Sequence, residues 1–163
     1  MNFNLSLYLV TDRGLAGGRD ISWIVREAVA GGVTMVQLRE KDCSTAEFVT
    51  LAKELKAALQ PLGVPLIIND RIDVALAVDA DGVHIGQSDM PYKTARALLG
   101  KNKIIGLSVE TMEEVIAAKE AELEANACDY EKYAALYAEK EAMDEQLLAL
   151  MEKWEQLSEE AGE

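Results

Sequence analysis

Residues 66–89 read LIINDRIDVALAVDADGVHIGQSD, and this stretch decides the fold. An apolar run from Leu66 to Asn69 precedes a short helical pattern from Arg71 to Val78 and a second apolar run from Gly82 to Ile85. Two short apolar runs separated by a helical stretch are typical of a βαβ unit with parallel strands. The stretch therefore predicts an α/β fold.

The same alternation continues outward in both directions. Further strands are expected at 7–11, 34–39 and 103–108, and further helices at 21–30, 44–59 and 91–99. Ser44 and Glu47 form a capping box at the start of the second helix, which Pro61 and Gly63 end. Five βα units in roughly 110 residues predict a parallel sheet with right-handed crossovers.

The composition changes near residue 111, which predicts two domains, 1–111 and 112–163. Residues 1–110 contain 12 Lys and Arg against 13 Asp and Glu, whereas residues 111–163 contain 4 against 16 and no proline. Such a composition is typical of long helices. Thr111 and Glu114 form a capping box for a first helix, and a turn at 126–129, with Asp129 as N-cap, precedes a second helix. We expect an acidic α-helical hairpin.

Apolar side chains of the second helix follow the 3.5-residue spacing of a coiled-coil seam. The seam positions are Leu136, Lys140, Met143, Leu147, Leu150, Trp154 and Leu157, with one charged residue among them. The first helix offers Val115, Ile116 and Leu123, which are too few to cover the longer helix. The rest of the seam should therefore pack on the sheet domain or on a second chain, and the sequence leaves both open.

Charge and hydropathy exclude several classes of protein. No apolar run approaches the length of a membrane span, and no secretion signal is visible, so we expect a cytoplasmic protein without membrane contact. The acidic tail disfavours nucleic acid as a partner. Cys43 and Cys128 stand far apart without a second cysteine or a histidine nearby, which favours reduced thiols over a disulfide or a zinc site.

Polar residues at the end of the second strand suggest an anion site. Gln37 and Arg39 share one face of the strand, and Lys41 follows just beyond it. An Arg fork beside a compact ammonium group suits a diphosphate. The alternative is that Arg39 and Lys41 are surface charges paired with Glu40 and Asp42.

Two carboxylates suggest a cation site at the same edge of the sheet. Asn69 and Asp70 end the third strand, and Asp89 lies four residues past the fourth. Mg²⁺ sites in proteins typically contain one or two carboxylates beside a phosphate, and water and phosphate oxygens supply the remaining ligands. Alternatively, Asp70 and Asp89 cap the helices that follow them, before Arg71 and Pro91.

Two further polar residues lie in or after these strands. His84 is the only histidine and is expected to be packed within its strand, so we leave it out of the site. Ser108, at the end of the fifth strand, either donates to a ligand or simply ends the strand. The first domain shows no activated Ser, Cys or His.

Four stretches, 7–13, 37–41, 67–75 and 82–89, together resemble the N-terminal part of thiamine phosphate synthase over residues 5 to about 120. The resemblance implies a (βα)₈ barrel, here partial, and a transferase of thiamine biosynthesis. Members of that family join hydroxymethylpyrimidine diphosphate to thiazole phosphate and release diphosphate. The related thiazole tautomerases usually lack this lysine and carboxylate pair, so Lys41, Asp70 and Asp89 favour the synthase.

The resemblance also implies roles for single residues. Gln37, Arg39, Lys41 and Asn69 would hold the pyrimidine diphosphate, and Ser108 would match the family's serine after the fifth strand. Asp70 and Asp89 would be the Mg²⁺ ligands. No side chain is implied as a catalytic nucleophile, because Mg²⁺ and cationic donors stabilise the leaving diphosphate.

The tail departs from that pattern after about Glu120. In the synthase family, a sixth strand with a phosphate-binding loop would follow, and then two further strands that bind the thiazole phosphate. Residues 120–160 instead resemble the C-terminal helical hairpin of F-subfamily ATP-binding-cassette ATPases, but no nucleotide-binding motif accompanies them. Five strands would leave two open edges. Alternatives to a synthase are therefore a non-catalytic remnant that binds Mg²⁺ and diphosphate, and a coiled-coil interaction protein. Either alternative would be compatible with a homo-oligomer that forms through the open sheet edges or through the helical tail.

Overall fold

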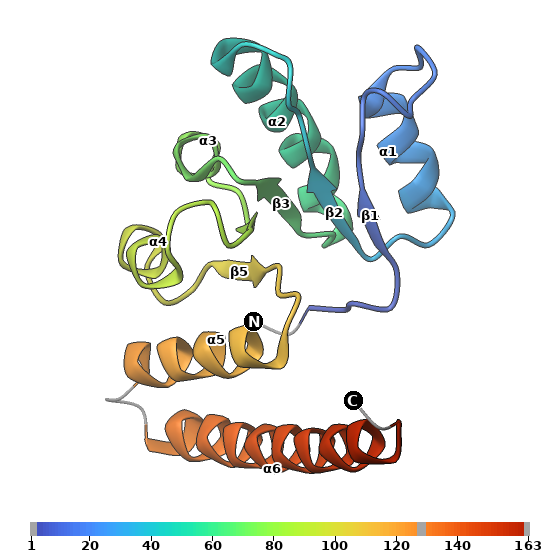
Figure 1. The fold of residues 1–163 in the computed structure, drawn as a ribbon. Coiled ribbons are helices and arrows are strands. Elements are labelled where there is room, and N and C mark those ends of the chain that lie inside the picture. The colour runs from blue at the N-terminus through green and yellow to red at the C-terminus, as the bar shows by residue number, and fades with distance from the viewer. Residues whose placement is uncertain (1–2, 127–129, 162–163) are drawn as a thin grey trace. The chain divides into compact units, whose positions relative to one another are not determined.

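The computed structural model describes residues 3–126 and 130–161 (Figure 1). Contacts divide the chain into two compact units, the first ending at Ser108 and the second beginning at Val109. Strands and helices alternate through the first unit, and helices alone follow in the second. The predicted α/β fold with a helical tail is confirmed.

The first unit contains four βα units and a fifth strand. Its elements are β1 (Tyr8–Val10), α1 (Ile21–Ala30), β2 (Met35–Leu38), α2 (Thr45–Leu59), the 3₁₀ turn η1 (Gln60–Leu62), β3 (Leu66–Asn69), α3 (Ile72–Ala77), β4 (Gly82–Ile85), α4 (Tyr92–Leu99) and β5 (Ile104–Leu107). Each strand and α-helix lies within a residue or two of its predicted range, and η1 was not predicted. Ser44 and Glu47 form both bonds of the capping box that starts α2.

The strands form one parallel sheet in the order β1-β2-β3-β4-β5. Its register aligns Val10 with Gln37, Gln37 with Ile67, and Gly82 with both Ile67 and Ile104. The outer edges of β1 and β5 have no strand partner within the described part of the chain. All carboxyl ends of the strands therefore lie along one rim, as in part of a (βα)₈ barrel.

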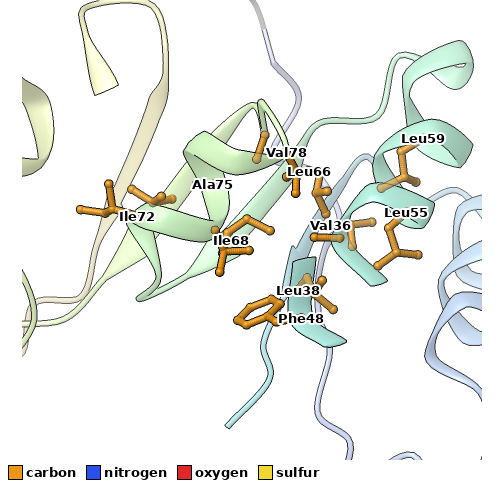
Figure 2. Packing of buried hydrophobic residues seen from close by; sticks show 14 of the residues in the cluster. Val36, Leu38, Phe48, Leu55, Leu59, Leu66, Ile68, Ile72, Ala75 and Val78 are labelled. Atoms are coloured by element: carbon orange, nitrogen blue, oxygen red, sulfur yellow. The ribbon is translucent and has the colours of Figure 1, made fainter. Parts of the chain in front are cut away.

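One face of the sheet packs against the helices. Val36 and Leu38 of β2 and Leu66 and Ile68 of β3 are fully buried, and Phe48 of α2 lies close to Leu38 (Figure 2). Successive side chains of a strand point to opposite faces. The residues between them therefore project away from the helices, which places Gln37 and Asn69 on the other face.

Glycines allow the last two strands to approach closely. A Cβ atom on Gly82 would lie 2.2 Å from the carbonyl oxygen of Ile104, and a Cβ on Gly106 would lie 2.4 Å from Nδ1 of His84. Neither distance is tolerated by a real side chain, so both positions require glycine. The second contact leaves room for the His84 ring beside β5.

The second unit is a helical hairpin of α5 (Met112–Ala125) and α6 (Tyr130–Ala161). Thr111 and Glu114 form the predicted capping box. Lys119 of α5 donates to Glu139 of α6 at 2.6 Å. Leu123 and Leu136 are buried. The predicted N-cap Asp129 and Cys128 lie outside the described residues.

The seam of α6 is covered only over its first half. Lys140 bonds Asp144 at 2.7 Å and Glu120 at 3.4 Å, so the one charged seam residue is paired. Farther along, Leu150 and Trp154 are 56% and 71% exposed, and the side chain of Leu157 lies outside the described residues. What covers this half stays a prediction.

None of the helices in the described ranges combines the length and the apolar character that crossing a membrane requires.

Candidate functional site: the carboxyl rim of the sheet

The rim gathers polar residues from three neighbouring strands. Asn69 ends β3 and lies opposite His84 of β4 in the strand register, and Ser108 directly follows β5. The Ser108 amide donates to the carbonyl of Ile85 at 2.9 Å, which extends the pairing of β4 and β5. The sheet therefore brings these predicted and unpredicted residues to one edge.

Asp70 and Asp89 lie near enough for the Asp89 carboxylate to raise the pKa of Asp70. Asp70 adopts a left-handed backbone conformation, with φ of 60°, and its amide donates to the carbonyl of His84 at 2.8 Å. Asp89 is fixed by the loop after β4, because the Gly86 amide donates to its Oδ2 at 2.7 Å. Burial, together with the Asp89 carboxylate, raises the pKa of Asp70.

The alternative role of these carboxylates as helix caps is wrong. The N-cap of α3 is Arg71 and that of α4 is Pro91, and neither helix shows a side-chain cap bond in this described part of the chain. Asp89 instead closes its own loop by accepting from Gly86. Neither carboxylate is therefore used as a helix cap.

Positive and amide groups surround the carboxylate pair. Lys41, in the loop after β2, is exposed, and its charge lowers the pKa of Asp70. The Asn69 side chain acts on the pKa of Asp70 in the same direction. The structure therefore brings Lys41, Asn69, Asp70 and Asp89 together, in agreement with the grouping expected from the strand ends.

Gln37 lies deeper in the sheet than an exposed anion site requires. Its side chain is 4% exposed, and its amide donates to the hydroxyl of Tyr8 in β1 at 2.8 Å. No local sequence signal pairs these residues, because they lie 29 positions apart. Gln37 faces the same side of the sheet as Asn69, so a ligand over this face could still reach it.

Arg39 is paired, but not as the alternative reading supposed. Its guanidinium bonds the carboxylate of Asp12, and its amide donates to Thr11 Oγ1 at 3.0 Å. Glu40 instead holds Arg13 through two bonds of 2.8 Å. Residues 12–14 and 39–42 line a small pocket of about 180 Å³ at this corner of the rim.

Ser108 is held by two residues of β4 and its loop that the sequence reading left without a role. Nε2 of His84 lies 2.9 Å from Oγ of Ser108. The side-chain amide of Gln87 donates to the backbone carbonyl of Ser108 at 2.6 Å. Burial lowers the pKa of His84, which keeps the ring neutral at pH 7. The only available sequence signal was that Gln87 belongs to a polar run after a strand.

The carboxylate pair fits a divalent cation. Two neighbouring carboxyl groups repel when both are ionised, so Asp89 adds to the effect of burial in raising the pKa of Asp70. No cluster of three or more His, Cys, Asp or Glu suited to a metal occurs among the residues described. Mg²⁺ matches this arrangement, because it usually takes one or two carboxylates and keeps several waters.

Comparison with known proteins gives the family. The family model described as thiamine monophosphate synthase matches residues 7–159. The chain belongs to the thiamine monophosphate synthase family. The match reaches beyond residue 120, where the resemblance was expected to end, and so includes most of the helical hairpin.

Curated members of the thiamine monophosphate synthase family are similar but longer. The thiamine-phosphate synthase of Clostridium acetobutylicum is 50% identical over 151 residues, covering 93% of this chain and 69% of that protein. The thiamine-phosphate synthase of Syntrophomonas wolfei is 60% identical over 114 residues, covering 70% of this chain and 54% of that protein. The chain thus spans between half and about two thirds of these relatives.

A solved family structure supports the fold of the sheet unit. The thiamine phosphate pyrophosphorylase of Pyrococcus furiosus is 41% identical, with a TM-score of 0.66, and the match covers 72% of this chain and 56% of that one. Nothing in these comparisons bears on the likeness of the hairpin to ATP-binding-cassette ATPases, which stays a prediction.

Proposed function

We propose that the rim of the sheet unit binds hydroxymethylpyrimidine diphosphate with Mg²⁺, as the pyrimidine half of a thiamine phosphate synthase. The observation that carries the proposal is the Asp70–Asp89 pair with Lys41 beside it. A pair of carboxylates attracts the cation, and a neighbouring ammonium group attracts the diphosphate. Family membership supports the same substrate class.

The cationic side chains would take the diphosphate oxygens. Lys41 is exposed and can swing toward a ligand without losing burial. Arg39 would first have to release Asp12, because its guanidinium is engaged there. The exchange replaces one carboxylate partner by another anion, so it costs little electrostatic energy.

Amide and hydroxyl groups would orient the pyrimidine. Gln37 and Asn69 project from the face of the sheet opposite the helices, and Ser108 stands at the end of β5. Each can donate a hydrogen bond without carrying charge. Together they would fix the ring over the sheet while the diphosphate lies at the rim.

Asp70 and Asp89 would hold Mg²⁺, which when bound neutralises charge on the departing diphosphate. The residues of this chain would otherwise bind and orient. The raised pKa of Asp70 means that a bound cation relieves an existing repulsion. No side chain is proposed as a nucleophile, because the thiazole nitrogen supplies the electron pair for the new bond.

Thiamine phosphate formation itself is the larger proposal, because the curated relatives are longer than this chain. We propose that a second chain completes the thiazole phosphate site at the open edges of the sheet. Mass spectrometry of the chain with both substrates and Mg²⁺ tests this. The expected result is thiamine phosphate above a no-enzyme control and its loss in Asp70→Asn; absence of product with the unaltered chain contradicts it.

The second candidate function is an interaction module, which the exposed half of the α6 seam favours. Leu150 and Trp154 would bury apolar surface against a second copy or another partner. Light scattering on Trp154→Glu tests self-association. A fall in mass from dimer to monomer is expected if the seam drives assembly, and an unchanged mass rules the seam out as the driver.

A further inference from the structure

Ser108 is fixed from two directions by neighbouring elements of the sheet unit. On the side-chain side, its Oγ lies 2.9 Å from Nε2 of His84. On the backbone side, the Ser108 carbonyl accepts a hydrogen bond from the side-chain amide of Gln87 at 2.6 Å. A residue at the end of an edge strand would ordinarily be loosely held, so two such contacts are more than the strand pairing requires.

Space for the His84 contact is built into β5. A Cβ atom on Gly106 would lie 2.4 Å from Nδ1 of the ring. The missing Cβ at Gly106 leaves room for the imidazole beside β5, where it reaches the serine two positions later.

The loop that holds the Ser108 carbonyl also carries a candidate metal ligand. The Gly86 amide donates to Oδ2 of Asp89 at 2.7 Å, and the Asp89 amide donates to the Gly86 carbonyl at 3.2 Å. Gln87 lies between these two residues. The loop of residues 86–89 thus links the carboxylate pair to Ser108 through one short turn.

We propose that His84 and Gln87 are positioning residues for Ser108, with His84 donating through Nε2–H so that the Ser108 hydroxyl proton points to an anionic ligand. The inference rests on the proposed diphosphate site. A hydroxyl has one proton to donate and two lone pairs that accept. Phosphate oxygens can only accept hydrogen bonds. The Ser108 hydroxyl proton can therefore reach a phosphate only if the hydroxyl does not donate it to the imidazole.

The tautomer is testable without any ligand, because His84 is the only histidine of the chain. Nitrogen-15 NMR of histidine-labelled protein at pH 8 reports which ring nitrogen carries the proton. The expected result is the Nε2–H form, with a resonance that shifts in Ser108→Ala and in Gln87→Leu but not in the matched control Gln60→Leu. The Nδ1–H form, or no shift in Gln87→Leu, overturns the proposal.

Ligand affinity then separates positioning from a general structural role. Calorimetry with hydroxymethylpyrimidine diphosphate and Mg²⁺ should show Ser108→Ala binding roughly tenfold more weakly, the loss expected for one hydrogen bond to a charged group. Gln87→Leu should weaken binding in the native background and add nothing in the Ser108→Ala background. Fully additive losses overturn the proposal.

The two experiments fail in different ways. If the unaltered chain binds no diphosphate, the proposed function fails, while the NMR result still decides whether His84 and Gln87 order Ser108 with the stated tautomer. If the chain binds the diphosphate but the two losses add, the proposed function stands and the positioning role falls.

Discussion

The Asp89 carboxylate raises the pKa of the Asp70 carboxyl group although 19 positions separate the two residues in the chain. Asp70 reaches this position from a left-handed backbone conformation after β3, and Asp89 from a loop closed on Gly86. A pair of this kind raises the free energy of the folded chain unless a proton or a cation lies between them. The relationship leads directly to predictions about stability.

Asp70→Asn should raise the thermal stability of the chain at pH 7 in EDTA. The change removes the repulsion between two carboxylates, and asparagine tolerates the left-handed conformation at least as well as aspartate. Differential scanning calorimetry gives the melting temperature. Added Mg²⁺ should then stabilise the native chain but leave the variant unaffected.

Asp79→Asn is the matched control for that measurement. Among the described residues, Asp79 is the other aspartate with positive φ, and its carboxylate accepts from Nζ of Lys103. This bond lowers the pKa of Asp79. The same substitution should therefore lower the melting temperature here, and an increase at both positions would show that backbone conformation, not charge, explains the Asp70 result.

The stability difference between the native chain and Asp70→Asn should depend on pH with a defined sign. The folded pKa of Asp70 is raised above the unfolded value of 3.8, so the folded state binds more protons between these two values. The loss of folding stability caused by the ionised Asp70 carboxylate is absent below the unfolded pKa and grows as pH rises through the folded pKa. Denaturant unfolding in EDTA should show the two proteins converging as pH falls toward 3.8, and a gap that widens on acidification would contradict the raised pKa.

Gly82→Ala should destabilise the sheet more than a typical surface change. The added Cβ would meet the Ile104 carbonyl oxygen at 2.2 Å and must push β5 from β4. Overpacking of this kind costs about 1–3 kcal/mol or more in the free energy of unfolding. Urea unfolding measures it, with Gly31→Ala as control, because the nearest atom there lies at 3.3 Å and φ is −80°.

Asp12→Asn should tighten binding of the diphosphate. The Asp12 carboxylate occupies the Arg39 guanidinium in the free chain, so it competes with an incoming anion. Calorimetry with Mg²⁺ present measures the affinity. Asp73→Asn, which frees Arg71 from a comparable exposed ion pair, serves as the control and should leave the affinity unchanged. If Asp12→Asn binds the diphosphate no more tightly than the native chain does, Arg39 does not bind the ligand.

The elements of the fold were predictable because their signals are local. α1 and β3 have their predicted bounds, which Gly31 and the run up to Asn69 mark directly, and α2 begins one residue later than predicted, after its capping Ser44. Strand neighbours followed from five consecutive βα units, which leave few topologies. Boundaries moved by a residue at α3, where no side chain caps the helix.

Site contacts were predictable only as a grouping at the rim. The rule that parallel strands end on one edge brought Asp70 and Asp89 together, but it said nothing of which side chain each residue bonds. Arg39 pairs with Asp12 and Gln37 with Tyr8 because β1 lies beside β2, and these partners are 27 and 29 positions apart. The Ser108 contact with His84 further depends on a missing Cβ at Gly106.

The decisive experiment is a calorimetric titration of hydroxymethylpyrimidine diphosphate into the full chain, in Mg²⁺ and in EDTA at equal ionic strength. We expect saturable binding in Mg²⁺ that is lost in EDTA and in Asp70→Asn. Binding of equal strength in EDTA, or no binding in Mg²⁺, would contradict the assignment of the Asp70–Asp89 rim as a diphosphate and Mg²⁺ site.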